Sequence, residues 1–176
     1  AETCPHYFSA TDELADGFNT NAKVNPPLRT DRDMAAVKAG LKDGTLDCIV
    51  TDHAPHHADQ KTVEFNVAAN GISGFETAFS LGYPNLVQTG VLTLEQLSLR
   101  MSAVPADILG IEGGILREGG RADITLVDEN ERYVIDTEEF VSKGKNSPFQ
   151  GFTVTGRVKH TISGGKLVVQ EGKVIA

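Results

Sequence analysis

The pattern of hydrophobic and polar positions along this chain changes near residue 121. Before that point, short apolar runs of strand type alternate with segments of helical periodicity. After it, short β-branched runs are separated by glycine turns, which is typical of an antiparallel β-meander. The pattern therefore predicts an α/β part followed by a small β part.

Two short apolar runs in the first part are candidates for strands. One lies within residues 2–8, and the other is 46–51, Leu-Asp-Cys-Ile-Val-Thr. A short, β-branched, continuously apolar run such as 46–51 is typical of a parallel strand covered on both faces. Because two strands cannot make such a sheet alone, the pattern indicates part of a larger β/α structure.

Capping residues and turns delimit the remaining elements. Thr30 or Asp31 begins a helix that Gly44 ends, and Thr93 begins another with a capping box. The expected helices are 31–43, 75–87, with Phe75 among its apolar anchors, 94–101 and 105–109. The segments expected as strands of the meander are 122–127, 132–135, 156–163, 166–170 and 173–175.

Composition excludes several classes of function. The chain has 176 residues, 40% of them hydrophobic, and a net charge of −8. The negative charge argues against nucleic-acid binding, which needs basic surface, and no run approaches the length of a membrane span. The two cysteines, Cys4 and Cys48, form no metal-binding CxxC pair, so we expect reduced thiols in a cytoplasmic protein.

The densest group of chemically active residues is Thr51-Asp52-His53-Ala54-Pro55-His56-His57. An aspartate directly after a buried strand lies at the strand's carboxyl end, where β/α folds bind ligands. Asp52 is therefore a candidate metal ligand or general base. Two readings stay open beside it: Asp52 caps a turn, or Asp52, His53 and His56 form a zinc site of their own.

Three other motifs have weaker signals. The rigid segment 23–29, Lys-Val-Asn-Pro-Pro-Leu-Arg, presents Asn25 to a polar ligand or is an ordinary connection. Gly71 precedes a predicted helix, where backbone N–H groups approach a ligand or a plain helix begins. His6 follows a strand and a proline, and on residue type alone it is an ordinary loop histidine.

In this order, the segments resemble the dihydroorotases of the amidohydrolase superfamily. The matching segments are 1–8 (Ala-Glu-Thr-Cys-Pro-His-Tyr-Phe), 23–29, 43–56 (Asp-Gly-Thr-Leu-Asp-Cys-Ile-Val-Thr-Asp-His-Ala-Pro-His), 71–77 (Gly-Ile-Ser-Gly-Phe-Glu-Thr) and 120–124 (Gly-Arg-Ala-Asp-Ile). The resemblance covers essentially the whole chain. It implies the C-terminal part of a TIM-type (β/α)8 barrel in residues 1–110 and a β-sandwich portion in residues 111–176.

The resemblance also implies the chemistry. It makes Asp52 a zinc ligand that takes a proton from the attacking water and delivers it to the leaving nitrogen. Asn25, His56 and Gly71 match positions that contact the substrate, and His53 matches a supporting residue. The implied reaction is the reversible conversion of N-carbamoyl-L-aspartate to L-dihydroorotate plus water, in de novo pyrimidine biosynthesis.

The family's other zinc ligands match no position here. We therefore expect Ala1 to be an interior residue of a longer protein, whose N-terminal portion completes the site, and the chain alone to be inactive. Further expected partners are the small-molecule substrate and, at the protein level, a second copy of the chain or aspartate transcarbamoylase. The alternatives are an inactive dihydroorotase-like structural partner in a pyrimidine-synthesis assembly and a hydantoinase or allantoinase relative.

Overall fold

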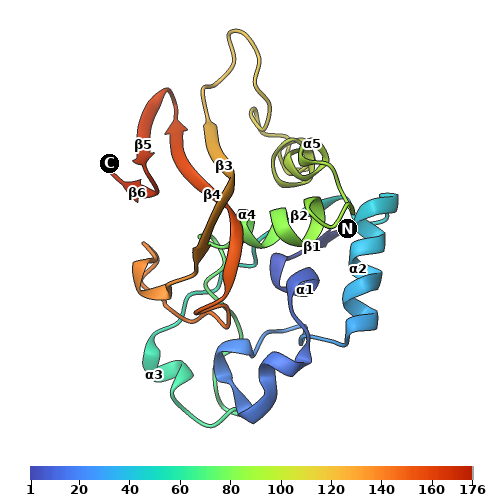
Figure 1. Cartoon of the computed structure of the whole chain (residues 1–176), viewed down its shortest axis with the longest axis vertical. Helices are drawn as coiled ribbons and strands as arrows, with labels where there is room; N and C mark the ends of the chain where they lie inside the picture. The colour runs from blue at the N-terminus through green and yellow to red at the C-terminus, as the bar shows by residue number, and fades with distance from the viewer. Residues whose placement is uncertain (176) are drawn as a thin grey trace.

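The computed structural model describes residues 1–175 and contains two separate sheets. In the smaller one, β1 (Glu2–Thr3) and β2 (Cys48–Ile49) pair in parallel, with Thr3 opposite Ile49. The two expected strands are therefore neighbours, although both are shorter than the apolar runs that predicted them. They lie in the middle of the molecule beside α1 (Pro5–Ser9) and α4 (Ala78–Gly82) (Figure 1).

The first apolar run turns into a helix after β1. Pro5 occupies the first turn of α1, where its missing N–H has no helical partner to lose. Phe8 is fully buried and Cys4 is buried, so the run is apolar because a helical turn packs into the core. The polar segment after it contains two 3-10 turns, Asp12–Phe18 and Thr20–Ala22.

The helix α2 (Asp31–Asp43) has both of its expected ends. The hydroxyl of Thr30 donates to Asp33 Oδ2 at 2.8 Å, and the Thr30 N–H donates to the same oxygen at 3.2 Å. Gly44 follows in the left-handed conformation that commonly ends a helix. The short helix α3 (Ala58–Lys61) was not expected.

The later helices are less regular than predicted, and the two expected at 94–101 and 105–109 are continuous. The helix α4 continues as a π turn over Tyr83–Val87, and α5 (Leu94–Ser98) continues through a π turn, Leu99–Ala103, into α6 (Val104–Leu109). Pro84 lies within the first π turn, and Pro105 follows the second by two residues. A proline lacks the N–H for the regular helical bond, and a wider turn relieves the clash of its ring with the preceding turn.

The β-meander is one four-stranded antiparallel sheet in the order β3-β4-β5-β6. Its strands are β3 (Ile124–Val134), β4 (Thr153–Ser163), β5 (Lys166–Gln170) and β6 (Lys173–Val174). The two runs expected at 122–127 and 132–135 form the single strand β3. The register shifts between Asp128 and Arg132, so polar residues bulge out of a continuous strand.

One hydrophobic cluster joins the two parts of the chain. It includes Val24 and Ile72 from the first part and Ile135, Phe149 and Val154 from the second. A division between residues 110 and 111 stays a prediction.

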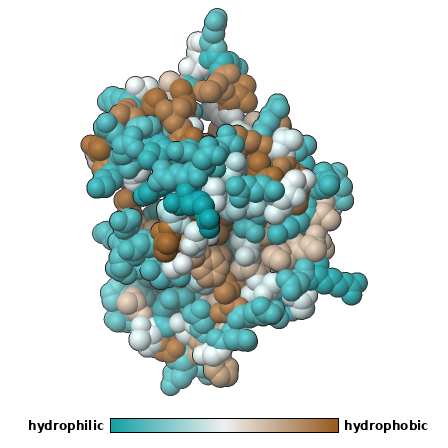
Figure 2. Space-filling model, in the orientation of Figure 1, coloured by the Kyte–Doolittle hydropathy of each residue, from teal (hydrophilic) through white to brown (hydrophobic). Residues whose placement is uncertain are grey.

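In Figure 2, apolar side chains gather near the top of the view, below the tip of the connection between α6 and β3. None of the described helices has the length and apolar composition to cross a membrane.

Candidate active site

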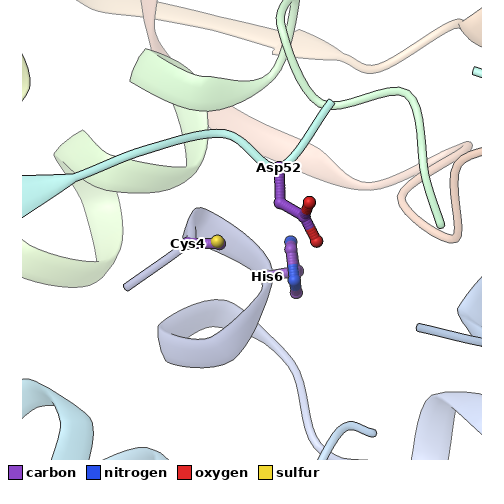
Figure 3. A group of neighbouring side chains, drawn as sticks. All are labelled: Cys4, His6 and Asp52. Carbon is purple, nitrogen blue, oxygen red and sulfur yellow. The ribbon is translucent and has the colours of Figure 1, made fainter. Parts of the chain in front are cut away.

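Asp52 lies three residues beyond β2, with its backbone in the left-handed region at φ 47°. Few residues other than glycine adopt this conformation, although aspartate is among the more tolerant, and such positions cluster at functional sites. The side chain is exposed and points towards His6, which belongs to α1 (Figure 3). The parallel pairing of β1 and β2 therefore brings the two side chains together across 46 positions of sequence.

His6 is 2% exposed, and its Nε2 has no hydrogen-bond partner among the described residues. A buried polar atom without a partner is uncommon in folded proteins and indicates a group that binds there. Burial lowers the pKa of His6 to about 4, so at neutral pH the ring is uncharged and one nitrogen offers a lone pair. From residue type alone we had expected His6 to be an ordinary loop histidine. Its position directly after a strand was the one feature of the sequence that could have indicated a functional residue.

Cys4 completes a small group of possible metal ligands with His6 and Asp52. One ligand atom from each of the three residues lies within 4.8 Å of the others. Thiolate, imidazole and carboxylate are all zinc ligands, so the donor types and the unpartnered Nε2 fit a zinc ion. Burial, followed by the charge of Asp52, raises the pKa of the Cys4 thiol to about 12. His6 and Asp52 are consequently the better donors at neutral pH.

The histidines after Asp52 face other partners. Nε2 of His56 lies 2.8 Å from the carbonyl oxygen of Asn70, which can only accept, so this nitrogen donates. Nδ1 of His53 accepts from the N–H groups of Gly74 and Phe75, at 3.1 and 3.3 Å. The zinc site of Asp52, His53 and His56 considered above is therefore not assembled in the described residues.

Phe75 differs from its expected role as a buried helix anchor. It is 64% exposed and lies before α4, and its ring stacks on His53 with the centroids 3.8 Å apart. The stacking and the two backbone hydrogen bonds hold the His53 ring in place. This arrangement is consistent with a supporting residue beside Asp52.

Gly71 lies against the loop that follows Asp52. Its φ is 125°, and a Cβ there would lie 2.5 Å from the Cβ of Ala54 and 3.2 Å from Nε2 of His56. Only glycine fits this conformation at this distance. The Gly71 N–H donates to the carbonyl oxygen of Lys23 at 2.9 Å, which ties the segment to the one that contains Asn25.

Asn25 is exposed between Val24, which is buried, and a cis peptide bond to Pro26. The hydroxyl of Tyr7 donates to the carbonyl oxygen of Pro26 at 2.7 Å, so α1 supports the Pro-Pro segment. The backbone contacts place the segments of Asn25, His56 and Gly71 side by side. Their contacts with a substrate stay a prediction.

Comparison with known proteins agrees with this arrangement of strands and polar loops. The chain belongs to the amidohydrolase family, whose model matches residues 7–168. It is 59% identical over 170 residues to a dihydroorotase of Acetivibrio thermocellus and 54% identical over 171 residues to one of Ruminiclostridium cellulolyticum. Each alignment covers 97% of this chain and 40% of the relative, so the chain spans about 40% of the length of these relatives.

Solved structures show the same family fold. An L-hydantoinase (dihydropyrimidinase) from Arthrobacter aurescens superimposes with a TM-score of 0.93 at 31% identity, over 99% of this chain and 40% of that one. A dihydropyrimidinase from Brevibacillus agri gives 0.90 at 26% identity, with the same coverage. The expected α/β amidohydrolase fold is thus confirmed, while completion of a barrel and a β-sandwich stays a prediction.

Proposed function

We propose that this chain forms part of the active site of a zinc-dependent cyclic amidohydrolase, a dihydroorotase. The enzyme interconverts N-carbamoyl-L-aspartate and L-dihydroorotate plus water, in de novo pyrimidine biosynthesis. The observation that supports this most directly is the placement of Asp52 three residues beyond β2, in a left-handed conformation, facing the neutral imidazole of His6. The dihydroorotases among its relatives, at 52–59% identity, support the choice of substrate.

Asp52 and His6 would hold the zinc ion within this chain. Zinc when bound supplies a Lewis acid and lowers the pKa of a coordinated water. The carboxylate of Asp52 accepts the proton of the attacking water. Once protonated, the same Oδ delivers that proton to the ring nitrogen as the amide bond breaks, so a single carboxylate acts as base and then as acid.

The polar groups around Asp52 would bind the substrate. The amide of Asn25 is exposed and offers N–H donors that suit the carboxylate and ring edges of the substrate. The ring of His56 is half-buried and held by the bond from its Nε2 to Asn70, so it offers the substrate its edge at Nδ1. The backbone of Gly71 approaches the ring of the substrate, since no side chain intervenes. The zinc charge and these donors compensate the negative charge of the substrate despite the net charge of −8.

A hydantoinase is the second candidate, because L- and D-hydantoinases are its structural neighbours, at 24–31% identity. The higher identity to dihydroorotases favours dihydroorotate over a hydantoin. A catalytically inactive structural partner is less consistent with the retention of Asp52 beside an unpartnered His6. Inactivity of the chain by itself, a cytoplasmic location and a complex with a second copy or with aspartate transcarbamoylase stay predictions.

The test compares the full-length protein with its Asp52→Asn variant. Hydrolysis of dihydroorotate and of hydantoin is measured, together with bound zinc and the unfolding midpoint. We expect the wild type to prefer dihydroorotate and Asp52→Asn to lose on the order of 10²- to 10⁴-fold in kcat while remaining folded. Asp107→Asn, an exposed change on α6, is the matched control. Preference for hydantoin, or normal turnover by Asp52→Asn, would refute the proposal.

A further inference from the structure

Asn146 lies in the connection between β3 and β4, far in sequence from every residue of the candidate site. Its side chain is 6% exposed and reaches the loops that contain His56 and Gly71. Oδ1 accepts from the N–H of His56 at 2.8 Å. Nδ2 donates to the carbonyl oxygens of Ala54 and Gly71, both at 3.0 Å.

These contacts determine the orientation of the amide. The carbonyl oxygens of Ala54 and Gly71 can only accept, so the nitrogen must face them, and the N–H of His56 requires the oxygen. Both hydrogens of Nδ2 and a lone pair of Oδ1 are therefore used in one buried position. If these hydrogen bonds were lost, buried polar groups of both loops would be left without partners, which destabilises a fold more than a hydrogen bond typically stabilises it.

The backbone around Asn146 makes the same connection. The N–H of Ser73 donates to the carbonyl oxygen of Asn146 at 2.8 Å. The hydroxyl of Ser73 donates to the carbonyl oxygen of Gly144 at 2.6 Å. A Cβ on Gly144 would lie 2.8 Å from the backbone nitrogen of His56. The β3–β4 connection thus lies directly against the two loops, and the side chain of Asn146 extends from this connection to lie between the two loops.

We infer that Asn146 is a positioning residue for the substrate contacts of the proposed dihydroorotase reaction. Its amide sets the spacing between His56 and Gly71, which lie on different loops and meet the same substrate. Asn146 itself does not touch the reacting atoms. The inference rests on the proposed function, because a substrate must bridge the two loops for their spacing to affect turnover.

The inference predicts a loss in substrate binding more than in chemistry. In Asn146→Asp, a carboxylate oxygen replaces the donor that faces the carbonyl oxygens of Ala54 and Gly71, while the side chain keeps nearly the same size. In Asn146→Ala all of these bonds are lost, together with the one that Oδ1 accepts from the hydroxyl of Ser73 at 3.2 Å. We expect KM for dihydroorotate to rise about tenfold or more in both variants, with kcat within about threefold of wild type.

The experiment uses the full-length protein, with Asn130→Ala, an exposed change on β3, as the matched control. Zinc content and unfolding midpoint are measured beside KM and kcat. Hydrogen exchange is followed in residues 53–57 and 70–74. The inference requires unchanged zinc, a higher KM and faster exchange confined to these two segments.

Three outcomes would overturn the inference: an unchanged KM in a folded variant, an equal fall in kcat and stability, or failure of both variants to fold. The last two would make Asn146 purely structural. If the wild type lacks turnover on dihydroorotate, the proposed function fails separately. The exchange rates then still decide whether Asn146 holds the two loops.

Discussion

Nε2 of His56 donates to the carbonyl oxygen of Asn70 at 2.8 Å, so the ring is attached to the backbone beside Gly71. The donating nitrogen has no lone pair for a metal ion, and the other ring nitrogen, Nδ1, faces Oε1 of Gln60 at 3.2 Å. His56 therefore belongs to the substrate side of the site, and His6 and Asp52 to the metal side.

This division predicts the effect of His56→Ala. We expect KM for dihydroorotate to rise on the order of tenfold or more, because a polar contact with the substrate is lost and Gly71 loses its neighbour. Bound zinc, measured by elemental analysis, stays at the wild-type level. His57→Ala is the matched control, since the neighbouring side chain is 74% exposed. Loss of zinc from His56→Ala would contradict the division.

Gly71→Ala tests the contact between the two loops. The new Cβ would lie 2.5 Å from the Cβ of Ala54, in a conformation with φ 125° that strains any side chain. We expect at least tenfold weaker substrate binding and a destabilisation of roughly 1–3 kcal/mol. Activity assays and thermal unfolding measure the two effects.

Two further variants separate collision from strain. Adding Ala54→Gly to Gly71→Ala removes the Cβ atom with which the new side chain collides, but the backbone strain at residue 71 stays. We therefore expect substrate binding to recover only in part. Gly90→Ala has positive φ and no atoms within 4 Å of the new Cβ, so only stability should fall. Full activity of the single variant Gly71→Ala would show that the loops do not need this close approach.

His6→Ala tests the metal side of the site. We expect zinc affinity to fall by about 10- to 100-fold or more, because a neutral buried donor beside Asp52 is removed. Competition with a chelator measures the affinity in the full-length protein. Cys4→Ser should retain zinc, since the Cys4 thiol, with its pKa raised to about 12, is protonated at neutral pH. The opposite ranking would make the Cys4 thiolate the ligand.

Lys61 predicts a pH dependence of stability. Its Nζ is buried and donates to the carbonyl oxygen of Ala69 at 2.8 Å. Burial, followed by the charge of Lys23, lowers the pKa of Lys61 to about 8 from its usual 10.5. Between these two values the unfolded chain binds the extra proton, so the contribution of Lys61 to stability grows as pH rises from 8 to 10.5 and is lost as pH falls through 8.

The measurement is the unfolding midpoint of wild type and Lys61→Met at several pH values from 7 to 10. We expect the rise in stability with pH that Lys61 causes to be absent from Lys61→Met, so that above pH 8 the unfolding midpoint of the wild type rises relative to that of the variant. Lys42→Met, an exposed change on α2, should follow wild type at every pH. A constant difference between Lys61→Met and wild type would place the Lys61 pKa at its ordinary value.

Local chemistry explains which elements could be predicted from the sequence. The ends of α2 depend on Thr30, Asp33 and Gly44, which lie within or next to the helix that they delimit. The existence of β1 and of β2 followed from two short apolar runs, and Asp52 from its position after the second run. In each case the determining residues are close neighbours in sequence.

The rest depended on contacts between distant residues. Asn146 bonds to His56 across 90 positions, and nothing in its neighbourhood marks it. His6 became a site candidate only when α1 turned it towards Asp52, because residue type alone favoured an ordinary histidine. The bulge in β3 joined two predicted strands, since the paired strand β4 and not the local pattern sets the register.

The hydrogen bonds of Ser73 to the β3–β4 connection also bear on protein engineering. Residues 54–56, 71–73 and 144–146 share one network of hydrogen bonds, although they are three separate stretches of sequence. Grafting any one stretch from a homologue would leave donors or acceptors of the other two unmatched. A chimera between family members of different specificity should therefore exchange the three stretches as one set.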